Sequence, residues 1–236
     1  MLTASVYKNI LSGKNLNSKQ LSILVDPDKF DVNSASQFLK SLPQETTHLF
    51  VGGSSVEADK TASAVRSLKM FTTLPVLLFP GDYTQITEEA DAVLYLSLLS
   101  GRNPEYLIEQ HVKSVKHLRN SKLEIIPTGY ILIDGGTESA VQRISNTPPI
   151  PQQEIEKIVD TALAGQFSGK KLIYLEAGSG AVNPVSEEII LAVKQAIQIP
   201  LIVGGGIKNS RQVNKAYNAG ADMLVIGTAF ETSSFL

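Results

Sequence analysis

The sequence predicts an α/β protein, a single (β/α)8 barrel of the TIM type, from three observations. Short apolar runs, each suited to a strand buried on both faces, alternate with amphipathic helical patterns along the chain. Three of the later runs end abruptly in glycine, within residues 171–180, 200–207 and 222–229. The chain has 236 residues, an ordinary length for one barrel, so we expect one domain over residues 1–236.

The start of the chain predicts an N-terminal helix within residues 1–19. Its apolar residues at helical spacing are Leu2, Val6, Ile10 and Leu11. We expect this helix to cap the bottom of the barrel. The alternative is a transient contact with a membrane surface, to which Lys8 and Lys14 would add little charge. The segment lacks the features of a signal peptide, so we expect a cytoplasmic protein.

Eight strand candidates follow in order. They cover residues 21–29, 47–55, 75–80, 92–97, 124–134, 172–176, 201–203 and 223–226. The helical patterns cover residues 34–42, 56–70, 105–118, 152–164, 186–197 and 209–219. Residues 81–89 are too few and too polar for a convincing crossover helix, and residues 135–151 are rich in turns. The chain ends soon after the last strand, so we expect the closing helix to be short or missing.

The composition excludes several classes of protein. The chain has 0 cysteines, which excludes disulfides, thiol catalysis and cysteine-bound zinc. Its net charge of −2 offers no basic field to nucleic acid. No apolar run approaches the ~20 residues of a membrane span. Among the 3 histidines, we expect His48 to begin a strand, and His111 and His117 to lie on a solvated helix face.

The glycine-ended strands predict a phosphate site at the C-terminal rim of the barrel. Glycine lets bare backbone N–H groups approach an anion closely, and a barrel brings the ends of neighbouring strands together. The alternative is that these glycines serve only tight turns between strand and helix. Three such ends in succession favour phosphate.

Two carboxylates and two hydroxyls predict a magnesium site at the same rim. Asp26 and Asp28 follow the first strand, and hard oxygen ligands beside a phosphate suit Mg²⁺. Ser54 and Ser55 follow the second strand and would add a hydroxyl to the ion. The alternatives are a turn capped by aspartate and a serine N-cap for a helix that opens at Val56.

Glu176 is the strongest single candidate for a catalytic residue. It ends a buried strand directly before Ala177-Gly178-Ser179-Gly180, so we expect it to face the mouth of the barrel. In a dry site its pKa would be raised, as suits a base. The alternative is a solvated rim residue or a structural ion pair.

These motifs, taken together, resemble one enzyme family. In order along the chain they are Asp26-Pro-Asp-Lys29, Gly52-Gly-Ser54, Tyr174-Leu-Glu-Ala-Gly-Ser-Gly180, Gly204-Gly-Gly-Ile207 and Gly227-Thr228. They resemble the geranylgeranylglyceryl phosphate synthase family, which includes the bacterial heptaprenylglyceryl phosphate synthases. The similarity runs from about Leu21 to Phe230. The Tyr-Leu-Glu motif is specific to it, whereas glycine-rich rims occur in many phosphate-binding barrels.

The resemblance implies a modified barrel in which an extended segment replaces the third helix. It implies Mg²⁺ as cofactor, held by Asp26 and Ser54. It places sn-glycerol 1-phosphate on Tyr174, Leu175, Glu176, Ala177, Gly178, Ser179, Gly180, Gly205, Gly206, Gly227 and Thr228. The form of the motif in this chain resembles members that use the C20 prenyl donor and form homodimers or homohexamers. Some members have a lysine where this chain has Leu24.

We therefore expect a prenyltransferase that joins geranylgeranyl diphosphate to the 3-hydroxyl of sn-glycerol 1-phosphate and releases diphosphate, with Glu176 as the base. The prenyl tail needs an apolar groove, for which Leu94, Tyr95 and Tyr130 are candidates or else core residues. One alternative is an isomerase or synthase of sugar-phosphate metabolism, which would need paired carboxylates across the mouth. Another is a non-catalytic barrel that binds phosphoglycerolipids.

Overall fold

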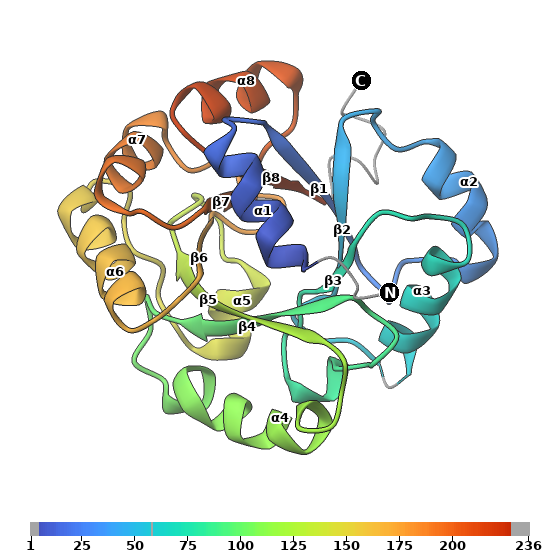
Figure 1. The fold of residues 1–236 in the computed structure, drawn as a ribbon. Coiled ribbons are helices and arrows are strands. Elements are labelled where there is room, and N and C mark those ends of the chain that lie inside the picture. The colour runs from blue at the N-terminus through green and yellow to red at the C-terminus, as the bar shows by residue number, and fades with distance from the viewer. Residues whose placement is uncertain (1–4, 58, 228–236) are drawn as a thin grey trace.

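The computed structural model describes residues 5–57 and 59–227, and its eight parallel strands close into a barrel in sequence order (Figure 1). The strands are β1 Gln20–Val25, β2 Thr46–Val51, β3 Val76–Leu78, β4 Ala92–Leu98, β5 Glu124–Leu132, β6 Leu172–Glu176, β7 Leu201–Gly204 and β8 Met223–Ile226. Closure by the pairing of β1 with β8 leaves no free sheet edge, which confirms the predicted barrel.

Most of the helices form a ring outside the strands (Figure 1). The α-helices are α1 Val6–Asn15, α2 Ala35–Lys40, α3 Lys60–Lys69, α4 Gln110–Leu118, α5 Ala140–Ser145, α6 Ile155–Phe167, α7 Glu187–Ala196 and α8 Ser210–Asn218. Shorter turns are the 3₁₀ turns η1 Val32–Ser34 and η2 Tyr83–Gln85, and a π-helical turn, η3 Glu105–Glu109, ahead of α4. Between β3 and β4 the chain forms only η2, so the predicted loss of the third helix is confirmed.

Alternating side chains of the strands build two apolar cores. The outward residues pack under the helices, as Leu49, Leu175 and Val203 do. The inward residues fill the barrel itself, as Leu77 and Ile126 do. The barrel is therefore a packed core, and only its rims are open to a site.

Helix α1 closes the bottom of the barrel, in front of the strands in Figure 1. Its residues Val6 and Ile10 are buried in the inner core. The carboxylate of Glu124, at the start of β5, accepts hydrogen bonds from the Ser5 hydroxyl at 2.6 Å and from the Val6 N–H at 2.5 Å. A carboxylate at a helix N-terminus is stabilised by the free N–H groups and the helix dipole. In the described part of the chain, no helix is long and apolar enough to cross a membrane.

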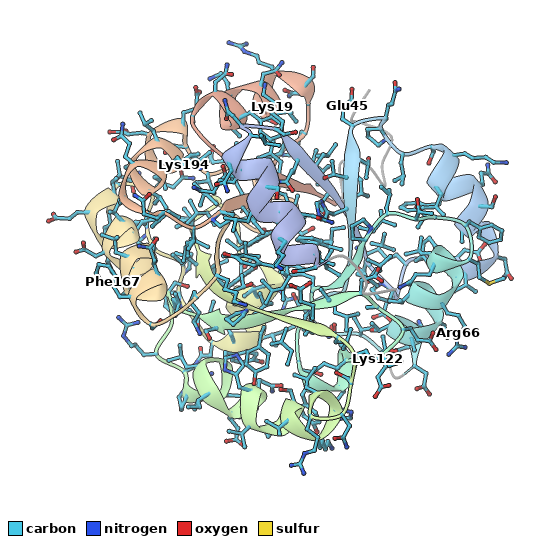
Figure 2. All side chains as sticks on the ribbon, in the orientation of Figure 1. Lys19, Glu45, Arg66, Lys122, Phe167 and Lys194 are labelled. Atoms are coloured by element: carbon cyan, nitrogen blue, oxygen red, sulfur yellow. The ribbon has the colours of Figure 1, made fainter. Side chains whose placement is uncertain are left out.

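Aspartate side chains also tie the bottoms of neighbouring strands together. Asp222 accepts a hydrogen bond from the Leu201 N–H at 2.8 Å and pairs with Lys194, which reaches it from α7 (labelled in Figure 2). Asp91 binds the Val76 N–H at 2.9 Å in the same way, ahead of β4. The bottom face is thus held by fixed hydrogen bonds, which leaves the top face for function.

Several sequence expectations are corrected. The helix predicted from Val56 begins at Lys60, because the Glu57 N–H bonds to the side chain of Asp28 and Asp59 turns with φ of 63°. The turn-rich stretch after β5 contains α5. His111 and His117 are partly buried and do not lie on a solvated face. Thr228 and the end of the chain, where we expect the closing helix to be short or missing, lie outside the described residues.

The first prediction concerns His48, which lies within β2. It is 4% exposed, its Nδ1 hydrogen-bonds the Thr47 hydroxyl at 2.8 Å, and burial lowers its pKa to about 4. An unfolded histidine takes up its proton near pH 6.5, so between that pH and about 4 the unfolded state binds more protons. The free energy of unfolding is therefore unaffected by the protonation of His48 above pH 6.5, and it decreases by up to about 3 kcal/mol as the pH is lowered to 4. Urea unfolding of parent and His48→Leu across this range should show a flatter pH dependence in the variant. Parallel curves would contradict the assignment.

Candidate active site

Glu176, the last residue of β6, is a buried carboxylate at the mouth of the barrel. Its side chain is 7% exposed, and its Oε1 accepts a hydrogen bond from the Gly178 N–H at 2.7 Å. Burial raises the pKa of Glu176, while hydrogen bonds from the Tyr174 hydroxyl and the Gly178 N–H counteract part of that rise. The prediction of a carboxylate facing a dry mouth agrees with this geometry.

The strand next to Glu176 must be bare backbone. A Cβ on Gly204 would overlap the Tyr174 hydroxyl and lie 3.2 Å from Glu176 Oε2. A Cβ on Gly205 would overlap Glu176 Oε1 and lie 2.5 Å from the Gly178 nitrogen. Glycine is therefore required at both positions for the carboxylate to occupy its place.

Free backbone donors gather beside this carboxylate. Gly180, Gly205 and Gly206 have φ of 75°, 79° and 71°, a left-handed conformation that favours glycine. Among the residues that the structure describes, their N–H groups have no hydrogen-bond partner. Successive N–H groups in such turns form a concave site for an anion. We refer to these three residues as the glycine rim.

A cavity of about 350 Å³ opens at the mouth and continues outward over the ends of β3 and β4. Its mouth is lined by Asp26, Ser54, Glu176, Ser179 and Gly227. The rest of its lining is mostly apolar and includes Ile86, Leu94, Tyr95, Leu96, Tyr106, His111, Val141 and Ile144. The missing third helix is what gives the cavity this outward course, because only η2 stands between β3 and β4.

Aromatic rings form the floor of the mouth. The rings of Tyr130 and Tyr174 stack with centroids 5.3 Å apart, and the ring of Phe79 lies 5.3 Å from that of Tyr174. Burial raises the pKa of both tyrosines well above the ordinary value, so their hydroxyls stay protonated. We call these three rings the aromatic floor.

The proposed metal ligands lie at the mouth, but not all the oxygens predicted there do. Asp26 lines the cavity with Ser54, and Lys29 pairs with its carboxylate at 3.0 Å. Asp28 turns away, since it accepts a hydrogen bond from the Glu57 N–H at 3.2 Å and pairs with Lys60 at 3.3 Å. No group of three or more His, Asp or Glu residues in the described ranges is arranged to hold a metal ion by itself. One carboxylate and one hydroxyl still fit Mg²⁺, which keeps several waters and takes phosphate oxygens from its substrate.

The other predicted substrate residues differ in their places. Ser179, Gly227 and Gly178 line the cavity, whereas the three glycines of the rim do not. Of these three, Gly205 packs against the lining residues Glu176 and Gly178. The side chain of Tyr174 lies beneath the mouth and supports Glu176. Leu175 and Ala177 are buried in the outer core, so only their backbone is near the site. The tail candidates Leu94, Tyr95 and Tyr130 all line the cavity.

Several residues that were not predicted from the sequence also line the cavity. Helix α5 supplies Val141 and Ile144, and Ser139 is its N-cap residue. Helix α4 supplies His111 and Ser114. The Nε2 of His111 lies 2.7 Å from the Leu96 carbonyl, and its ring stacks on Tyr95 at 4.1 Å. The only sequence signal for α5 was the length of the turn-rich stretch, which is typical of functional loops.

The second prediction tests the glycine rim. Gly180→Ala places a methyl group at the rim where no atom lies within 4 Å, so it should weaken binding of sn-glycerol 1-phosphate about tenfold by crowding the anion. Gly169→Ala is the matched control, since Gly169 also has a left-handed φ, of 88°, with nothing within 4 Å, but lies at the end of α6. Calorimetry should show equal stability losses and a binding loss only in Gly180→Ala. Equal affinity in both variants would place the phosphate elsewhere.

Comparison with known proteins agrees with this geometry. The model of the PcrB family matches residues 15–234. The chain is 58% identical to the geranylgeranylglyceryl phosphate synthase of Zunongwangia profunda, over 96% of this chain and 97% of that protein. It is 38% identical to the synthase of Pyrococcus furiosus, over 93% and 88%.

Solved structures extend the likeness to three dimensions. The chain superimposes with a TM-score of 0.88 and 32% identity on the synthase of Thermoplasma acidophilum in complex with its substrate sn-glycerol-1-phosphate, over 97% of this chain and 92% of that one. Tryptophan synthase α-subunit from Pyrococcus furiosus, at 13% identity and a TM-score of 0.54, shares the fold alone. The chain belongs to the PcrB family, that of the geranylgeranylglyceryl phosphate synthases.

Proposed function

We propose that the protein is a prenyltransferase that joins geranylgeranyl diphosphate to the 3-hydroxyl of sn-glycerol 1-phosphate. The observation that carries this proposal is the buried carboxylate of Glu176, which lines the mouth of the apolar cavity and packs against Gly205 of the glycine rim. A phosphoglycerol and a hydrocarbon chain need these two environments side by side. The complex of the Thermoplasma acidophilum synthase with sn-glycerol-1-phosphate supports the glycerol half.

The reaction breaks the bond between C1 of the prenyl chain and the diphosphate oxygen, and diphosphate leaves with the electron pair. The glycerol 3-oxygen forms the new ether bond to C1 and gives up its proton. Glu176 is the group placed to accept that proton and to hold the hydroxyl beforehand. Its raised pKa brings it closer to the working pH, which suits a general base.

The walls of the mouth suit the positive charge that develops on the allylic C1. Phe79 and Tyr130 line the cavity, and an aromatic ring that turns its face to a cation attracts it by ~0.5–2 kcal/mol. The nearby Glu176 carboxylate adds a fixed negative charge. The apolar outer cavity excludes water, which would otherwise capture the cation.

Asp26 and Ser54 would hold Mg²⁺ at the diphosphate end of the cavity, where the ion neutralises the leaving group's charge. Asp26 lines the mouth, where its Oδ1 accepts a hydrogen bond from the Asp28 N–H at 3.1 Å. Its Oδ2 pairs with Lys29 at 3.0 Å, so Mg²⁺ would share this carboxylate with a cation that also lines the cavity.

A homodimer or homohexamer is proposed with the function. Three apolar residues on α4 or just before it, Ile108, Val112 and Val115, are 61%, 61% and 42% exposed and follow one face at helical spacing. An exposed apolar stripe on the outer ring of helices supports an interface with a second copy of this chain. A transient membrane contact at the cavity outlet, where the prenyl donor would enter, is also part of the proposal.

The direct test of the function is incubation with prenyl diphosphates of graded length and with each glycerol phosphate enantiomer, followed by mass analysis. We expect the ether of the C20 donor with sn-glycerol 1-phosphate. Absence of any ether product, with intact substrates recovered, would contradict the function.

The third prediction concerns Glu176. Glu176→Gln keeps the size and polarity of the side chain but cannot take the proton, so turnover should fall by ~10²–10⁴-fold with little change in prenyl diphosphate affinity. The parent's activity should fall on the acid side above the pH expected for an exposed glutamate, because protonation removes the base. Glu188→Gln, at an exposed position on α7, is the control. If Glu176→Gln turns over like the parent at saturating substrates, the base lies elsewhere.

The fourth prediction concerns the metal. Asp26→Asn keeps the shape but removes the charge that would hold Mg²⁺, so activity should fall by orders of magnitude while the affinity for sn-glycerol 1-phosphate stays near that of the parent. Asp28→Asn is the matched control, because Asp28 is turned towards α3 and away from the cavity. The activity of the parent and of both variants is measured as a function of Mg²⁺ concentration. Full activity in Asp26→Asn, or of the parent in EDTA, would rule out this site.

A further inference from the structure

The segment that replaces the third helix is joined to the loop after β2 by one buried amide. Gln85, in η2, is 3% exposed, and its Nε2 donates to the Gly53 carbonyl at 2.9 Å. Its Oε1 accepts from the Gly81 N–H at 3.2 Å and from the Gly53 N–H at 3.5 Å. The side chain thus uses both its donor and its acceptor on backbone groups, which a glutamine can do and a carboxylate cannot.

Glycines bring the two segments into backbone contact at this place. A Cβ on Gly52 would overlap the Phe79 carbonyl oxygen. A Cβ on Gly81 would lie 2.5 Å from the Gly53 carbonyl oxygen and 2.6 Å from that of Ser54. The position of Ser54 is therefore set by the segment that follows β3.

The far side of η2 is fixed to α4. The Tyr83 N–H donates to Gln110 Oε1 at 2.9 Å, and Gln110 Nε2 donates to Glu105 at 2.7 Å. Gly53, Ser54, Tyr83 and Gln110 all line the cavity. Gln85 stands behind them, so any effect that it has on a ligand passes through the residues it holds.

We infer that Gln85 is a positioning residue for the prenyl diphosphate: it holds the Gly53–Ser54 backbone, through which the loop meets the diphosphate and its Mg²⁺. The inference rests on the proposed function and adds to it which part of the chain sets the diphosphate end. The glycerol phosphate end is built from the loops after β6 and β7, which make none of these contacts. Replacement of Gln85 should therefore weaken the binding of the prenyl diphosphate and leave the binding of glycerol phosphate unchanged.

The test measures binding of two probes by calorimetry in the full chain. The probes are the unreactive geranylgeranyl S-thiolodiphosphate with Mg²⁺, and sn-glycerol 1-phosphate alone. In Gln85→Leu we expect the thiolodiphosphate to bind about ten- to hundredfold more weakly, because Gly53 loses its partners. The affinity for sn-glycerol 1-phosphate should stay within about twofold of the parent.

A second variant keeps the shape of the side chain. In Gln85→Glu the ionised carboxylate accepts from the two N–H groups but faces the Gly53 carbonyl without a proton to donate. Thiolodiphosphate binding, relative to the parent at the same pH, should be weak at pH 8 and recover towards pH 5 as the carboxyl group is protonated. This variant tests the role of Gln85 even if Gln85→Leu does not fold.

The control for lost stability is Gln166→Leu. Gln166 also binds backbone, accepting from the Gln198 N–H at 2.6 Å, but it does so at the bottom of the barrel. This variant should bind both probes like the parent. The inference is overturned if Gln85→Leu binds the thiolodiphosphate like the parent, if it loses both probes equally, or if Gln85→Glu shows no recovery at low pH. A parent that binds neither probe would instead overturn the proposed function.

Discussion

The structure of the mouth depends on one constraint, the burial of the Glu176 carboxylate against strands that carry no side chain beside it. A single Cβ on Gly204 or Gly205 would displace the carboxylate or the Tyr174 hydroxyl that supports it. Gly205 also belongs to the glycine rim, whose N–H groups have no hydrogen-bond partner among the described residues. One glycine thus joins the buried carboxylate to the proposed anion site.

The two ends of the cavity are built by different parts of the barrel. The loops after β6 and β7 pack backbone to backbone at the end proposed for glycerol phosphate, where Gly205 meets Gly178. At the other end, the loop after β2 rests on the segment that replaces the third helix. The loss of that helix therefore has two consequences: it leaves the apolar cavity open between β3 and β4, and it supports the end proposed for the diphosphate. An isomerase of sugar phosphates would have no use for the long apolar part.

Much of this could be predicted from sequence, for physical reasons. A buried parallel strand is a short apolar run, and its end is marked where glycine follows, so β6, β7 and β8 and the position of Glu176 could be read directly. The start of α3 was misplaced because its first turn is replaced by contacts to Asp28, which is distant in sequence. Helix α5 has only 6 residues, too few for a periodic pattern. Gln85 lies in a polar stretch, where neither periodicity nor a motif separates a buried amide from a solvated one.

The proposed chemistry at the mouth requires Glu176 to be a buried, hydrogen-bonded carboxylate with a raised pKa. The most direct measurement is an NMR titration of the side-chain carboxyl carbons in the protein labelled with ¹³C at glutamate, with Glu176→Gln to assign the resonance. We predict one resonance, absent from the variant, that titrates above the range of the exposed glutamates. A Glu176 resonance that titrates with the exposed glutamates would show a solvated side chain and contradict the account.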